Sequence, residues 1–145
     1  MNTSVCRAIS NLMNFLSYKF FDQNGGSFEL FVDEVALAEQ VNFDDTLIPY
    51  WIIDKGIPTF PPYQIPKEIS ERIIAACGCG EYGCDCITCK VIIENDFVIF
   101  SDFKRPGYSG VIDKTFKFTE KNFREVEKQL MCEAEKIRKS FEIET

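Results

Sequence analysis

The cysteine-rich segment 77–89, CGCGEYGCDCITC, constrains the fold more than any other stretch, because it contains five of the chain's seven cysteines. Its residues 80–83, GEYG, predict a four-residue hairpin loop that joins two antiparallel strands. In that hairpin Cys79 faces Cys84 and Cys77 faces Cys86. Side chains two residues apart on a strand point to the same side, so the sequence predicts four thiols on one face.

A cluster of thiols allows three interpretations. Four thiolates arranged as a tetrahedron are a typical ligand set for a structural zinc ion. The predicted ligands are Cys77, Cys79, Cys84 and Cys86, with Cys89 as a substitute because Cys86 and Cys89 form a C-x2-C pair. Alternatively, the residues are reduced thiols that pack as small apolar side chains, or they have a disulfide or redox role. Structural zinc is therefore the one cofactor that the sequence suggests, and the spacing alone does not decide between the three.

The sequence predicts an α+β fold, in which an antiparallel β-meander packs against an N-terminal helix and a long C-terminal helix. The meander and the long helix are predicted from the C-terminal half. Strands are predicted at 72–79, 84–93 and 97–103, with a tight turn at 94–96. Thr119 is a good N-cap for the last helix, and Phe118 and Phe123 form a hydrophobic staple around it. The predicted buried stripe of this helix consists of Phe123, Val126, Leu130, Ala134, Ile137 and Phe141. We predict a single domain over residues 1–145.

The N-terminal half is less regular. Residues 4–20 predict a helix, because Val5, Ala8, Ile9, Leu12, Leu16 and Phe20 follow one another at three- and four-residue steps. A strand is predicted at 28–32, turning at Asp33 and Glu34, and residues 35–43 fit either a second strand or a short helix. Residues 49–66 hold five of the six prolines and the only tryptophan, Trp51. They predict an ordered but irregular segment with one short helix.

The cysteine segment also resembles a stretch found in small uncharacterised bacterial proteins. Their pattern is a strand ending in C-x-C-G, two further residues, G-C, and then two strands joined by a tight turn. The residues that carry the resemblance are Cys77, Cys79, Gly80, Gly83, Cys84 and the run 97–103. The resemblance implies a bacterial source and a single α+β domain, but it implies no activity. Cys86 and Cys89 lie outside the shared pattern.

The stretch between Lys19 and Lys55 contains no basic residue and eight acidic ones. The acids are Asp22, Glu29, Asp33, Glu34, Glu39, Asp44, Asp45 and Asp54, and the interleaved aromatic residues include Phe31, Phe43, Tyr50 and Trp51. Acids steer an encounter with a basic protein, and aromatic side chains anchor it. The predicted partner-binding residues are Asp33, Glu34, Glu39, Asp44, Asp45, Trp51 and Asp54. The alternative is a solvated acidic surface that keeps the protein in solution.

The absence of histidine narrows the function. It excludes Ser-His-Asp and Cys-His catalysis and His-ligated zinc, so an enzyme would depend on carboxylates, Lys, Tyr or Cys. The net charge of −7 argues against nucleic acid or an anionic membrane as the partner. No stretch of about 18 apolar residues is present, and residues 1–21 lack the features of a signal peptide, so we expect a cytoplasmic protein.

Three functional classes remain after these exclusions. The first is a non-catalytic binding protein, most concretely an immunity protein that neutralises a basic toxin, including the toxins of contact-dependent inhibition. The chain resembles immunity proteins in being small, acidic and single-domain. The second is a cysteine-rich module, stabilised by zinc, that serves as a regulator or scaffold. The third, an enzyme, has no motif in its favour, so we predict no catalytic residues.

Overall fold

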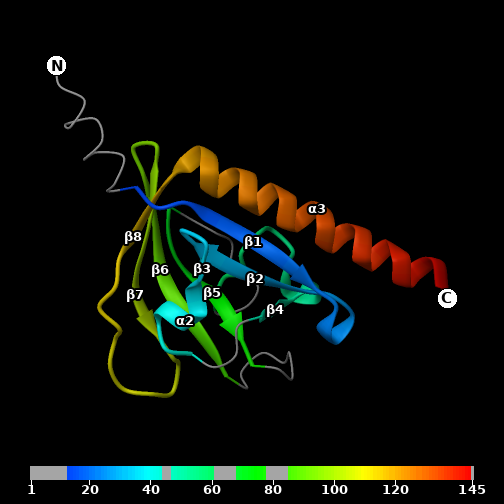
Figure 1. Ribbon diagram of the computed structural model, residues 1–145, viewed down its shortest axis with the longest axis horizontal. Coiled ribbons are helices and arrows are strands. Elements are labelled where there is room, and N and C mark those ends of the chain that lie inside the picture. Colours follow the sequence, from blue (N-terminus) through cyan, green and yellow to red (C-terminus); the bar gives the residue numbers. More distant parts are fainter. Residues whose placement is uncertain (1–12, 44–46, 61–67, 78–84, 145) are drawn as a thin grey trace.

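The computed structural model describes residues 13–43, 47–60, 68–77 and 85–144 (Figure 1). Within these residues, eight strands form two antiparallel four-stranded sheets, and the fold is α+β. The first sheet contains β1 (Leu16–Phe21), β2 (Ser27–Val32), β3 (Val35–Ala36) and β4 (Leu47–Pro49), and β2 pairs with the other three. The second contains β5 (Ile69–Ala76), β6 (Cys86–Glu94), β7 (Phe97–Lys104) and β8 (Phe116–Thr119), in chain order.

The helical elements are one long helix and three short ones within the described residues. Helix α3 (Glu120–Glu144) lies along β1 and extends past the sheets at its C-terminal end (Figure 1). The short elements are η1 (Gln23–Gly25), α2 (Leu37–Gln40) and η2 (Tyr50–Ile52). None of the described helices is both long enough and apolar enough to cross a membrane.

Both predicted tight turns are confirmed. Asp33 and Glu34 join β2 to β3 with φ angles of 52° and 68°. Asn95 and Asp96 join β6 to β7 with φ angles of 48° and 71°. Two central residues with positive φ define a turn whose twist matches that of the flanking strands, and Asn and Asp tolerate this conformation better than most residues.

The two sheets share one hydrophobic core. Phe28, Leu30 and Val32 of β2 point into it, and so do Ile87, Cys89 and Val91 of β6. Segments that precede and follow the first sheet also form backbone hydrogen bonds with strands of the second sheet. The Asn14 N–H donates to the Lys117 carbonyl at 2.7 Å beside β8, and the Phe60 N–H donates to the Glu71 carbonyl at 2.7 Å beside β5.

Helix α3 begins as the sequence predicts. The Asn122 N–H donates to Thr119 Oγ1 at 3.0 Å, which confirms Thr119 as the N-cap. Phe118 and Phe123 are fully buried, and both rings pack edge-on against Phe100, with centroid distances of 4.9 and 5.9 Å. The staple therefore docks the first turn of the helix onto β7 and β8.

The buried stripe of α3 is confirmed from Phe123 to Ala134, and Ile137 is partly buried. Phe141 is 41% exposed, so its assignment to the stripe is wrong. It lies in the last part of the helix, which extends past the sheets.

The predicted N-terminal helix is wrong for residues 16–20, which form strand β1. Leu16, Tyr18 and Phe20 alternate with Ser17 and Lys19, so this stretch also fits the two-residue period of a strand. Pairing with β2 along all six residues of β1 selects the strand. Residues 4–12 of that predicted helix lie outside the described residues.

Other expectations were partly correct. Residues 35–43 contain both alternatives, since β3 leads directly into α2. The described part of the proline-rich segment, residues 49–60, contains the short helical turn η2. The meander is confirmed from β5 to β7, but it continues into β8, which the sequence did not suggest. The predicted loop at 80–83 lies outside the described residues.

Candidate protein-binding surface

The predicted acidic residues are divided between two ends of the first sheet. Asp33 and Glu34 form the turn after β2, whereas Asp54 follows η2, which is joined to β4 beside the start of β2. The five steps from Ser27 to Val32 span roughly 17 Å, at about 3.4 Å per residue. The structure therefore does not bring Asp33 and Glu34 together with Trp51 and Asp54.

The acids at the two ends also differ in their surroundings. The Asp33 carboxylate accepts hydrogen bonds from Asn14 Nδ2 at 2.7 Å and from the Phe15 N–H at 2.8 Å, so it fixes the entry to β1. Glu34 and Glu39 are exposed. Asp54 is exposed and follows Trp51 by three residues, and Trp51 is itself 42% exposed. Asp44 and Asp45 lie outside the described residues.

Four aromatic side chains meet where η1, η2 and the end of α3 converge. We name Phe20, Tyr50, Trp51 and Phe141 the aromatic patch. The Tyr50 ring is central: it stacks on Phe141 with centroids 5.7 Å apart at 26°, and it meets Trp51 edge-on at 5.4 Å. Phe20, Trp51 and Phe141 are 47%, 42% and 41% exposed, so the patch combines mutual packing with access to solvent.

The glycine pair of the η1 turn lets these side chains approach one another. A Cβ atom on Gly25 would lie 3.2 Å from Phe141 and 3.7 Å from Tyr50. A Cβ atom on Gly26 would lie 3.3 Å from Phe20 and 2.8 Å from Ile137. Phe20 therefore lies beside Gly26, and Phe141 and Tyr50 lie beside Gly25, the adjacent residue of the same turn.

Charges at the patch are exposed rather than buried. Asp22 precedes η1 and Asp54 follows η2, and both side chains lie in solvent. Lys55 is exposed beside Asp54, so the rim carries both signs of charge with acids on two sides. The apolar area in the centre and the charged rim form the arrangement that is typical of protein interfaces.

Two members of the aromatic patch were missed from the sequence. Phe20 and Phe141 fit the spacing of apolar stripes, so both were assigned to the core. Phe141 is the last aromatic residue of a 25-residue helix. A helix of this length is longer than the sheet on which it packs. Helix length was therefore the available signal that its last turns project beyond the core. Of the other predicted aromatics, Phe43 is buried under the Arg105 guanidinium.

Of the described cysteines, Cys77 and Cys86 are neighbours at the paired ends of β5 and β6, whereas Cys89 lies in the main core. In β5 and β6, Ala76 faces Cys86, and the Cys77 N–H donates to the Asp85 carbonyl at 2.9 Å. This register differs by one residue from the predicted pairing of Cys77 with Cys86. A β-bulge between Ile73 and Ala75 changes the register once more along the same strand pair, so that Ile73 faces Thr88.

Cys86 and Cys89 lie in different apolar clusters. Cys86 packs with Ile73 and Ala76, whereas Cys89 is fully buried in the main core. Burial raises the pKa of Cys86 to about 11 and raises the pKa of Cys89 further. Both thiols therefore have the properties of apolar core groups rather than of nucleophiles.

The zinc prediction stays a prediction. Among the described residues, no group of three or more Cys, Asp or Glu side chains is placed to hold a metal ion. Cys79 and Cys84 lie outside the described residues. Cys89 is on the opposite face of β6 from Cys86, so the structure does not bring this substitute ligand to the predicted set.

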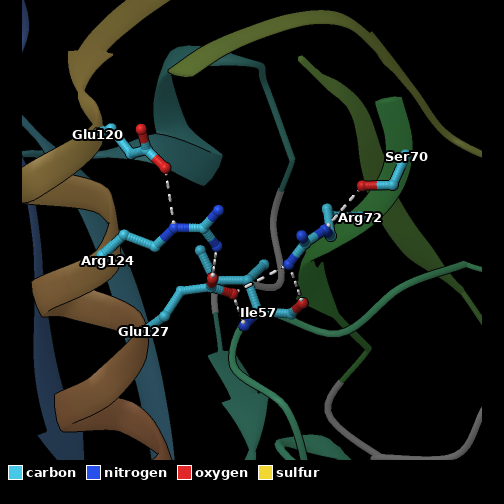
Figure 2. A network of polar contacts seen from close by, with 6 residues as sticks. All are labelled: Ile57, Ser70, Arg72, Glu120, Arg124 and Glu127. Atoms are coloured by element: carbon cyan, nitrogen blue, oxygen red, sulfur yellow. Dashed lines mark hydrogen bonds and ion pairs between the residues drawn. The ribbon is translucent and has the colours of Figure 1, made fainter. Parts of the chain in front are cut away.

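A buried polar network joins α3 to the second sheet (Figure 2). Arg72 of β5 donates from Nη1 to Glu127 Oε2 and to the Ile57 carbonyl, each at 2.9 Å. The same Glu127 oxygen accepts the Ile57 N–H at 2.8 Å. Desolvation raises the pKa of Glu127, while the Arg72 charge acts in the opposite direction. Every contact is internal, so we assign the network to structure and not to ligand binding.

A groove of about 480 Å³ separates β1 from the first half of α3. Phe15, Leu16 and Val126 supply its apolar lining, and Lys121 and Glu125 place opposite charges on its helical side. Opposite charges favour neither an anionic nor a cationic ligand. The groove therefore defines no ligand class.

Comparison of the chain with family models, with curated proteins and with solved structures gives no match.

Proposed function

We propose that this is a non-catalytic cytoplasmic protein that acts by stoichiometric binding of a basic protein partner. In its most concrete form it is an immunity protein that neutralises a bacterial toxin domain. The observation that carries the proposal is the aromatic patch, in which three side chains, Phe20, Trp51 and Phe141, stay more than 40% exposed although they gather from separate segments.

Exposed aromatic clusters of this kind are a common feature of binding sites. Large aromatic side chains bury much apolar area on binding and lose little conformational entropy, and so they dominate interface energies. The patch differs from scattered, isolated apolar side chains on a surface, because Tyr50 packs against both Trp51 and Phe141. These three side chains therefore already have defined positions in the free protein.

The charge of the chain supports a basic partner. The net charge is −7, and Asp22 and Asp54 flank the aromatic patch. Acids at the rim accelerate the encounter with a positively charged surface, and the aromatic centre then limits dissociation. We place the contact at the patch and not over the whole predicted acidic face, because Asp33 and Glu34 lie at the far end of β2.

The test uses the purified product of the open reading frame directly upstream, with binding measured by surface plasmon resonance at two salt concentrations. Trp51→Ala should accelerate dissociation roughly 30-fold, the effect of a hot-spot residue worth about 2 kcal/mol. The double variant Asp22→Lys/Asp54→Lys should slow association and reduce its dependence on salt.

Two further variants delimit the surface. Glu94→Lys, which makes the same reversal of charge at one site at the exposed end of β6, is the control and should have little effect. Glu34→Lys tests whether the contact extends from the aromatic patch to the wider acidic face. This variant should have little effect on binding only if the contact is confined to the patch. A partner that binds with unchanged affinity after Trp51→Ala would refute the proposal, and so would an upstream product that does not bind at all.

A further inference from the structure

The turn that carries Trp51 is held by a cation from another element. Arg138 of α3 donates from Nη2 to the Tyr50 carbonyl at 3.3 Å and to the Ile53 carbonyl. These carbonyls lie at the two ends of η2, on either side of Trp51. The Arg138 side chain is 29% exposed and forms an ion pair with Glu135 at 3.7 Å.

Other contacts fix the same turn. The Ile53 N–H donates to the Tyr50 carbonyl at 3.1 Å, and the Tyr50 N–H donates to the Gly26 carbonyl at 3.0 Å. The Phe141 ring, three residues after Arg138 on the helix, stacks on the ring of Tyr50. The backbone of η2 therefore depends on two side chains of α3, one polar and one aromatic.

Isolated three-residue helical turns have little intrinsic stability, because each of their hydrogen bonds closes a short and strained ring. A guanidinium that binds two carbonyls at once supplies the missing restraint, since its donors form a rigid fork. A lysine at the same position offers a single point charge without this geometry.

We infer that Arg138 is a positioning residue, which keeps the Trp51 turn preformed for the partner without contacting the partner itself. The inference rests on the proposed function of the aromatic patch. It adds that a side chain of α3 holds the binding site in place before the partner arrives. A preformed turn lowers the entropy that is lost on binding, so its removal weakens affinity although no partner contact is lost.

The experiment uses Trp51 as an internal probe, because it is the only tryptophan of the chain. In the full-length protein, Arg138→Met keeps the apolar stem but removes both donors. We expect stronger quenching of Trp51 fluorescence by acrylamide and an added nanosecond component in its anisotropy decay. Arg138→Lys should give an intermediate result, and it serves as the test variant if Arg138→Met does not fold.

Arg124→Met is the matched control, because Arg124 lies on the same helix, is exposed and pairs with Glu120. It should leave the fluorescence of Trp51 unchanged. If Arg138→Met retains its fold and leaves quenching and anisotropy as in the wild type, the inference is overturned.

A second measurement separates this inference from the proposed function. With the upstream gene product as partner, Arg138→Met should slow association severalfold, while Trp51→Ala accelerates dissociation. Unchanged binding by Arg138→Met overturns the positioning role, even where Trp51→Ala weakens binding. Unchanged binding by Trp51→Ala overturns the proposed function, and that result does not depend on the fluorescence of Arg138→Met.

Discussion

Arg72 Nη1 lies 2.9 Å from Glu127 Oε2, and both side chains are more than 90% buried. The pair joins β5 to α3 across 55 positions of sequence, and Ile57 completes the network from the irregular segment before β5. Two parts of the chain, strand β5 and the segment that contains Ile57, are thereby held against α3. This relationship gives the first two predictions.

Arg72→Met should lower the free energy of unfolding by about 3–5 kcal/mol, because it leaves the Glu127 carboxylate buried without its cation. Urea denaturation measures the effect. The control is Lys104→Met, which breaks the solvent-accessible ion pair with Glu71, and it should cost less than about 1 kcal/mol. Equal losses in the two variants would contradict a special role for the buried pair.

The same pair predicts a dependence on pH. Desolvation raises the pKa of Glu127 in the folded protein, so the folded state holds this proton more tightly than the unfolded chain does. The resulting stabilisation is complete below the unfolded pKa of about 4.3, and it is lost as the pH rises through the folded pKa. The measurement is the unfolding free energy of wild type minus that of Glu127→Gln over this range. The difference should fall with rising pH, whereas a rise would mean that Arg72 outweighs desolvation.

The staple of α3 gives a prediction about packing. Phe123→Ala should destabilise the protein by about 3–5 kcal/mol, because the ring is fully buried against Phe100 and its removal leaves a cavity. Phe141→Ala removes the same side chain from an exposed position of the same helix, so its cost should be well below that of Phe123→Ala. Thermal and urea unfolding both report the difference. Similar costs for both variants would show that the first turn of α3 is not docked.

The sequence predicted the elements whose signals are local. The N-cap Thr119, the staple around it and the two-residue turns at Asp33-Glu34 and Asn95-Asp96 all depend on neighbouring residues, and all are confirmed. The stretch 16–20 fits both the helical and the strand period, and only pairing with β2, which lies farther along the chain, selects the strand. Local patterns could not decide this, because the deciding contacts are tertiary.

The candidate surface was predicted in part for a similar reason. Trp51 and Asp54 were identified from composition, and both are exposed at the aromatic patch. Phe20 and Phe141 were not, because an apolar residue at helical spacing is normally part of the core. The predicted acidic face was too extended, since sequence proximity does not reveal that β2 separates Asp33 from Trp51. The register of Cys77 and Cys86 differs by one residue from the prediction, which took it from an assumed four-residue loop at 80–83, and turn residues alone do not fix the register of the strands they join.

The cysteines give a prediction about reactivity. Cys132 is exposed on α3, whereas Cys89 is fully buried and its pKa is raised by desolvation. Iodoacetamide at pH 8 should therefore modify Cys132 rapidly and Cys89 only after unfolding. Peptide mass spectrometry resolves the two sites, and labelling in urea is the positive control. Rapid modification of Cys89 in the native protein would contradict its place in the core.

Gly56 supplies the final prediction. Its φ is +99°, and a Cβ atom there would overlap Oε2 of Glu127 and lie 2.6 Å from Cδ of that residue. Gly56→Ala therefore combines backbone strain with displacement of the buried carboxylate, which would also lose its contacts with Arg72 and Ile57. Gly107→Ala is the matched control, since φ is +90° there and nothing lies within 4 Å of the added atom. The control should cost about 1–2 kcal/mol, the usual penalty for a left-handed alanine. Gly56→Ala should cost at least about 2 kcal/mol more, because a buried hydrogen-bonded charge loses its position. Urea denaturation of both variants gives the difference directly. If the two variants lose the same unfolding free energy, backbone strain alone explains the effect at Gly56. The close approach of Glu127 to this turn would then make no contribution to it.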